Sequence, residues 1–272
     1  MTEMTSETAL KALTGWWEEM GVTPDPAVMR AFAKAARSSQ AAAPQGASSE
    51  TKAAPPPQRR KTAKSLEHWV SEARSAAADC KDMGALTEVI GAFEGCPLKE
   101  GCRSTVVFDG QVGAPIMVIG EGPGADEDKA GKPFVGRAGQ LLDRMLAAIG
   151  ISRSSNALIT NVNYWRPPRN RNPEPDELAV CRPFVDRMIE LTTPKLIITA
   201  GAIPSQSLLD TRTGITRLRG QEKAYVTPGG TEAPVFPMLH PAFLLRRPQE
   251  KSRAWRDLQL IEGRARELGA LD

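Results

Sequence analysis

Short apolar runs alternate with helical patterns from residue 116 onward, and this alternation restricts the possible folds more than any other feature. Four runs are short and rich in β-branched residues, as buried strands are: Ile116–Ile119, Ala157–Asn161, Lys195–Thr199 and Val235–Leu239. Apolar residues recur at helical spacing in Gly139–Ile149, Asp176–Leu191, Ile203–Leu209 and Ser252–Leu268. Helices that separate strands cover both faces of a parallel sheet. We therefore expect an α/β fold, a three-layer α/β/α sandwich around a four-stranded parallel sheet.

The first part of the chain has a different composition. Residues 1–35 carry a helical apolar pattern and are expected to form an extra N-terminal helical segment. Residues 36–63 are rich in Ala, Ser and Pro, so they bury too little apolar surface to fold and are expected to be a disordered linker. Helical spacing returns in Leu66–Phe93, and residues 64–272 are therefore predicted to form the α/β domain.

Length and composition set further bounds. The chain has 272 residues and a net charge of +3, which is long enough for one sizeable core. We find no apolar run that would span a bilayer and no signal-peptide pattern, so we expect a cytoplasmic protein without a membrane partner, acting as a monomer. Four cysteines in such a chain favour free thiols or a metal site over a disulfide framework: Cys80, Cys96, Cys102 and Cys181.

A glycine-rich stretch, V-I-G-E-G-P-G-A-D-E-D-K-A-G-K-P-F-V-G (Val118–Gly136), follows the first predicted strand. Its glycines let the backbone approach a ligand closely. A phosphate-binding loop is disfavoured, because a Walker loop ends in Gly-Lys-Ser/Thr, whereas acidic residues follow the glycines here. An ordinary strand-to-helix loop remains the alternative.

A basic loop, N-V-N-Y-W-R-P-P-R-N-R-N-P, leaves the second predicted strand at Asn161. Its two adjacent prolines make it rigid, and Arg166, Arg169 and Arg171 suit contacts to DNA phosphates. A solvated basic loop is the alternative.

His240 follows the last predicted strand in F-P-M-L-H-P-A-F-L-L-R-R-P. The apolar and basic residues after it, including Leu244 and Arg246, suit a wedge inserted into a duplex; a packed connection and a structural histidine are the alternatives. Because ligands of parallel sheets bind beyond the carboxyl ends of the strands, the three loops predict one shared site.

Taken together, the three motifs resemble those of family 4 uracil-DNA glycosylases. G-E-G-P-G resembles the first motif, T-N-V-x-x-x-R-P-P-x-N-R the second, and H-P-A-F-L-L-R the third, with Ala242 in place of a serine. The resemblance covers about residues 90–266. It implies a DNA repair enzyme that flips uracil out of DNA and hydrolyses its N-glycosidic bond, leaving an abasic site.

The resemblance also implies how uracil is bound. Asn161 matches the residue that contacts the flipped base, and an amide supplies both the donor and the acceptor that the O4 and N3–H edge of uracil requires. Phe134 matches the aromatic residue that stacks on the base, and the backbone of Glu121 and Gly122 lines the pocket.

Further residues are implied in the chemistry. Glu127 would close the C5 edge, where thymine carries its methyl group, and Asn170 matches a second polar residue of the pocket. Both are candidates for activating the water, since Gly122 stands where the best-known uracil glycosylases have an aspartate. His240 would donate, as a neutral imidazole, to O2 of the departing uracil.

Family 4 members typically carry an iron–sulfur cluster on four cysteines. Cys96 and Cys181 match two of these positions, but Phe93 and Trp165 occupy the others, and aromatic rings cannot ligate iron. We therefore expect no cluster and no other metal or cofactor, with the two rings filling the space.

Two other functions are possible for the same fold. One is a non-catalytic module that binds uracil- or abasic-site DNA. The other is the branch of the superfamily that links covalently to abasic sites, but its inserted loop with a reactive histidine is missing here, because Arg169–Pro173 runs directly on.

Overall fold

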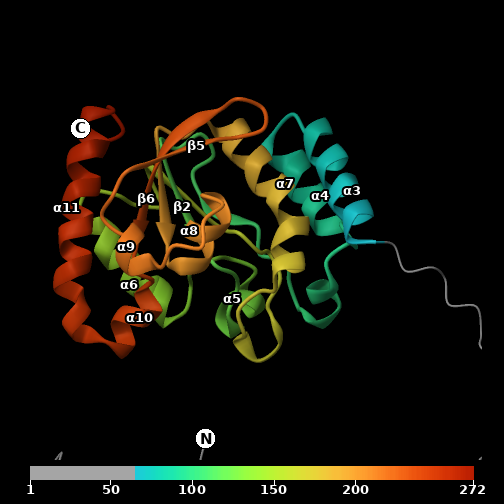
Figure 1. The fold of residues 1–272 in the computed structure, drawn as a ribbon, viewed down its shortest axis with the longest axis horizontal. Coiled ribbons are helices and arrows are strands. Elements are labelled where there is room, and N and C mark those ends of the chain that lie inside the picture. Colours follow the sequence, from blue (N-terminus) through green and yellow to red (C-terminus); the bar gives the residue numbers. More distant parts are fainter. Residues whose placement is uncertain (1–64) are drawn as a thin grey trace, which may run out of the picture. The chain divides into compact units, whose positions relative to one another are not determined.

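A six-stranded mixed sheet forms the centre of the fold (Figure 1). The computed structural model describes residues 65–272, which belong to one compact unit. The helical segment expected for residues 1–35 and the linker expected for residues 36–63 lie outside the described residues. The strand order is β1-β3-β2-β4-β6-β5.

The four predicted strands are all present and run parallel at the centre of this sheet. They are β2 (Ile116–Gly120), β3 (Ala157–Asn161), β4 (Leu196–Ala200) and β6 (Glu232–Met238). The predicted number of strands was wrong, because antiparallel strands border them: β1 (Phe108–Gly110) and β5 (Lys223–Val226). β1 has only 3 residues and β5 is partly exposed, so neither shows a clear apolar run.

Helices cover both faces of the sheet, which confirms the three layers. Side chains of β2 alternate between two core clusters, since successive residues of a strand point to opposite faces. Met117 and Ile119 pack in the cluster that contains residues of α3 (Leu66–Asp79), α4 (Met83–Ala92) and α7 (Pro175–Thr192). Ile116 and Val118 pack in the cluster with α6 (Arg137–Ala147) and α11 (Lys251–Glu267).

The predicted helical run Leu66–Phe93 is divided into two helices. Asp82 separates them, because its carboxylate accepts a hydrogen bond from the backbone N–H of Ala85 at 2.8 Å and caps α4. Short helices also lie between strands: α5 (Ala125–Ala130), α8 (Ala202–Leu208), α9 (Ile215–Leu218) and the 3-10 turn Pro168–Asn170. The 3-10 turn Pro97–Gly101 precedes β1, and α10 (Pro241–Arg246) and the 3-10 turn Pro248–Glu250 lead from β6 to α11.

The strand order fixes where a ligand site is expected in such a sheet. The chain passes from β2 to β3 on one side, and then crosses to β4 on the other side of β2. Loops that leave neighbouring strands in opposite directions open a crevice at the carboxyl ends. Among residues 65–272, no helix has the length and apolar character needed to cross a membrane.

Candidate active site

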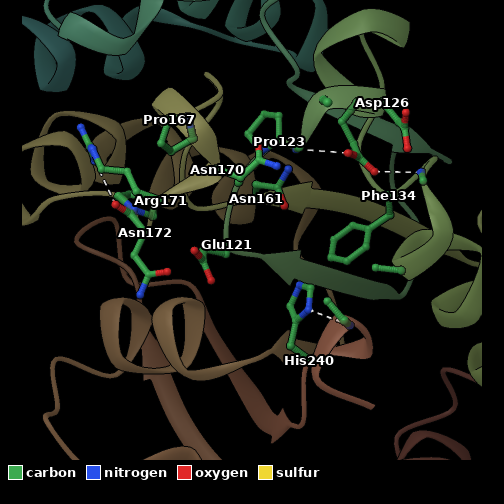
Figure 2. A pocket seen from close by; sticks show the side chains of 18 of the residues that line it. Glu121, Pro123, Asp126, Phe134, Asn161, Pro167, Asn170, Arg171, Asn172 and His240 are labelled. Atoms are coloured by element: carbon green, nitrogen blue, oxygen red, sulfur yellow. Dashed lines mark hydrogen bonds between the residues drawn. The ribbon is translucent and has the colours of Figure 1, made fainter. Parts of the chain in front are cut away.

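A cavity of about 520 Å³ opens at the carboxyl ends of the parallel strands (Figure 2). The loops after β2, β3 and β6 all contribute to its wall. Of the residues singled out from the sequence, it is lined by Glu121, Gly122, Glu127, Phe134, Asn161, Asn170, Arg171, His240 and Arg246. The structure thus brings the three motifs together, as the topology predicts, while Arg166, Arg169 and Leu244 lie outside the lining.

Asn161 is the last residue of β3 and is paired with Gly120 of β2. Its side chain is only 2% exposed, and its Nδ2 has no hydrogen-bond partner among the described residues. A buried polar group without a partner costs about 1–3 kcal/mol. Because Asn161 lines the cavity, a ligand that accepts a hydrogen bond there would remove this cost.

Gly120 allows an amide and an aromatic ring to meet at the end of β2. A Cβ at this position would lie 2.5 Å from Oδ1 of Asn161 and 2.5 Å from the ring of Phe134. Phe134 itself has a φ of 54°, in the left-handed region that a bulky residue seldom adopts. This backbone conformation costs on the order of 1–3 kcal/mol, so surrounding contacts must hold it.

His240 caps the start of α10 and stacks near Phe134, with ring centroids 5.9 Å apart. Its Nδ1 accepts a hydrogen bond from the backbone N–H of Ala242 at 3.1 Å, so the neutral ring carries its proton on Nε2. Burial, assisted by the positive charge of Arg246, lowers the pKa of His240 from 6.5 to about 4, although Glu127 opposes this. At neutral pH the ring is therefore an uncharged donor.

Glu127 uses both carboxylate oxygens to bind backbone N–H groups. Oε2 accepts from Gly124 at 3.1 Å, and Oε1 accepts from Val135 at 3.0 Å and Gly136 at 2.9 Å. These bonds join the start of α5 to the segment that carries Phe134. The carboxylate thus supports the cavity wall in addition to lining it.

Glu121 contributes a side chain that sequence reasoning did not use, since only its backbone was expected to line the pocket. Figure 2 shows its carboxyl group inside the cavity. Burial raises the pKa of this carboxyl above its ordinary value. Its place directly after a buried strand was the signal available in the sequence.

The predicted DNA-binding arginines fall into two groups. Arg171 forms an ion pair with the buried carboxylate of Glu177, with bonds of 2.6 and 2.8 Å, and Arg166 donates to Oδ1 of Asn170 at 2.7 Å. The side chains of Arg169 and Arg246 are exposed and form no ion pair or hydrogen bond within residues 65–272. These two are available to bind phosphates.

Leu244 does not have the position expected of a wedge. It is 1% exposed and packs with Leu141, Leu239 and Ala254, because α10 turns it toward α6 and α11. The next residue, Leu245, is 36% exposed and is the leucine of this helix at the surface.

The region where the family resemblance places a metal cluster is filled by aromatic rings. The ring centroid of Phe93 lies 6.5 Å from that of Trp165 and 5.1 Å from that of Phe184. Cys96 and Cys181 are buried free thiols, and the neighbouring thiol of Cys181 lowers the pKa of Cys96. No three His, Cys, Asp or Glu side chains are arranged to hold a metal ion in the described part of the chain. Two thiols do not fit a four-cysteine cluster.

Comparison with known proteins agrees with this architecture. Residues 108–259 match the family described as the uracil DNA glycosylase superfamily. The chain is 35% identical to a Type-4 uracil-DNA glycosylase of Pyrobaculum aerophilum over 185 residues, which cover 67% of this chain and 94% of the relative. It is 39% identical to a Type-4 uracil-DNA glycosylase of Thermotoga maritima over 165 residues, 60% of this chain and 83% of the relative. The chain therefore belongs to the uracil DNA glycosylase superfamily.

Proposed function

We propose that this protein is a DNA repair glycosylase that removes uracil from DNA and leaves an abasic site. The observation that carries the proposal is the buried Nδ2 of Asn161, which has no hydrogen-bond partner within residues 65–272 and lies in a cavity beside an aromatic ring. This amide would donate to O4 of uracil and accept from N3–H. Cytosine presents the opposite pattern at these positions and would leave the amide unsatisfied.

The base would enter the cavity after it rotates out of the DNA stack, which costs a few kcal/mol. Phe134 would cover one face of the ring, because its side chain packs against the ends of both β2 and β3. The segment held by Glu127 would lie at the C5 edge and exclude the methyl group of thymine. Selection of uracil thus depends on one amide and on a wall fixed by backbone hydrogen bonds.

Bond cleavage transfers the electron pair of the N-glycosidic bond to uracil, and the oxygen of a water adds to C1′ of the sugar. The proton that this water loses balances the negative charge of the departing uracil. His240 would donate from Nε2 to O2 of uracil, where negative charge develops. A preorganised donor of this kind contributes about a hundredfold to a thousandfold in rate. Three residues are candidates for orienting the water: Glu127, Asn170 and Glu121, whose carboxyl lies in the cavity.

The DNA surface would consist of exposed groups around the cavity. Arg169 and Arg246 would bind phosphates, whose contacts position the duplex without reading its sequence. Arg166 and Arg171 would act mainly by fixing their own loop, given their bonds to Asn170 and Glu177. We propose that the protein acts as a monomer, since one chain supplies this whole lining.

We further propose that no iron–sulfur cluster is bound, because Phe93 and Trp165 occupy two ligand positions and pack together in the core. The measurement is the iron content and visible absorption of protein purified without oxygen. A stoichiometric cluster would contradict the proposal.

The proposed activity is tested by single-turnover excision on oligonucleotides that contain uracil, thymine or cytosine at one position. We expect the wild type to excise only uracil, and Asn161→Ala to lower this rate at least about a hundredfold. Gln111→Ala is the control, because it removes an exposed amide next to the edge strand β1 that does not line the cavity.

Two outcomes would refute the assignment. Tight binding of uracil- or abasic-site DNA without excision would indicate a non-catalytic module. A DNA adduct that survives denaturation would indicate the covalent branch of the superfamily.

A further inference from the structure

Arg153 lies outside the cavity, in the turn between α6 and β3, yet it binds the segment that carries Phe134. Its Nη2 donates to the carbonyl oxygen of Phe134 at 2.9 Å, and its Nη1 donates to that of Pro133 at 3.0 Å. The side chain is 18% exposed, so water competes little for these bonds. Two successive carbonyl groups are therefore held by one planar guanidinium.

Two carboxylates fix the guanidinium in turn. Oδ1 of Asp143, on α6, accepts from Nε of Arg153 at 3.0 Å and from Nη2 at 2.8 Å. Oδ2 of Asp109, on the edge strand β1, accepts from Nη1 at 3.0 Å. Because a guanidinium has a rigid fork of donors, these contacts leave it little freedom to turn away from the two carbonyl groups.

The same segment is held from its other side. Glu127 accepts hydrogen bonds from the backbone N–H groups of Val135 and Gly136. The first turn of α6 also packs against the carbonyl group of Phe134 so closely that a Cβ on Gly139 would collide with it. Phe134 thus keeps its left-handed φ of 54° because Arg153 binds carbonyl groups on one side of it and Glu127 binds backbone N–H groups on the other.

We propose that Arg153 is a positioning residue, which sets the direction of the Phe134 ring over the cavity by holding the carbonyl groups of Pro133 and Phe134. The inference rests on the proposed function, since the direction of the ring matters for excision only if a base stacks on it. Arg153 itself does not line the cavity.

The first test is a double-mutant cycle on single-turnover uracil excision. Arg153→Met should lower the rate about 10- to 100-fold, because a small misplacement of a site residue has effects of this size. In a Phe134→Ala background the same change should alter the rate less than about twofold, since the ring through which Arg153 acts is gone. Equal losses in both backgrounds would overturn the proposal.

Two further variants separate positioning from general stability. Lys132→Ala removes another ion-pair partner of Asp109 without touching either carbonyl group, and should leave the rate near that of the wild type. Arg153→Lys keeps the positive charge beside both carboxylates but cannot bind both carbonyl groups. It replaces Arg153→Met if that variant does not fold, and a wild-type rate for Arg153→Lys would also overturn the proposal.

Hydrogen exchange provides a readout that does not depend on activity. Arg153→Met should increase exchange at the amides of Val135 and Gly136, whereas Lys132→Ala should not. If the wild type excises no uracil, the proposed function fails, and the exchange data still decide whether Arg153 holds this segment. Unchanged protection in Arg153→Met would show that it does not.

Discussion

The buried, neutral state of His240 makes the stability of the folded protein depend on pH in a calculable way. The pKa of His240 is about 4 in the folded protein, against 6.5 for the unperturbed side chain. As the pH falls below 6.5, His240 binds a proton in the unfolded chain but stays neutral in the folded protein until the pH approaches about 4. Folding is therefore weakened between the two pKa values, and the contribution is constant at higher pH.

The size of this effect follows from the two values. At about pH 5 the wild type should have lost about 2 kcal/mol of unfolding free energy relative to about pH 8, and at about pH 4 the loss should reach about 3 kcal/mol. Replacing the ring with an amide, in His240→Gln, removes the titrating group and with it this loss.

The assay is urea unfolding of the wild type and of His240→Gln at a series of pH values, followed by tryptophan fluorescence. His68 and every carboxylate are present in both proteins, so the difference between their unfolding free energies isolates His240. We expect this difference to change by about 2 kcal/mol between about pH 8 and about pH 5. Parallel curves would show that His240 titrates normally, and the argument for a neutral donor would be refuted.

The contacts around the site also predict the effects of substitutions at Leu244, Leu245 and Gly120. Leu244→Ala should lower the unfolding free energy by about 2–5 kcal/mol in urea unfolding, because it empties a core position. Leu245→Ala should leave stability nearly unchanged and lower the rate of excision from duplex DNA. The reverse pattern would support Leu244 as the residue that inserts into the duplex. Gly120→Ala should abolish uracil excision, since its methyl group would lie 2.5 Å from the ring of Phe134. Gly101→Ala is the matched control, because a Cβ there meets no atom of the described residues within 4 Å. An active Gly120→Ala protein would contradict the geometry.

The central strands and the shared site could be predicted from the sequence because each depends on strong, short-range signals. Strands buried on both faces are continuous apolar runs, as Ile116–Ile119 is. Once such strands are known to be parallel, their following loops must meet at one edge of the sheet. The juxtaposition of Asn161, Phe134 and His240 is a consequence of this topology.

The features that the sequence did not reveal depend on the direction in which individual side chains point in the folded protein. In F-L-L-R the pattern does not show which leucine faces the core, so Leu244 and Leu245 could not be distinguished. The ion pair of Arg171 with Glu177 removes an arginine from the expected DNA surface, and it forms only because the chain turns back at the start of α7. Arg153 reaches Phe134 from a turn that carries no recognisable motif.

The aromatic side chain at the position of a missing cysteine has a structural role close to the site. Trp165 is fully buried, and its Nε1 donates to the hydroxyl of Thr105 at 3.1 Å. The amide of Asn163 binds both backbone groups of Trp165, and it also lies 3.1 Å from where a Cβ of Gly122 would be. The packed ring and the amide thus fix the backbone of the loop after β3, which lies beside Gly122 of the glycine-rich loop. Because these contacts are made by the chain itself, Trp165 at a position that the family resemblance assigns to cysteine is compatible with an ordered loop beside the cavity.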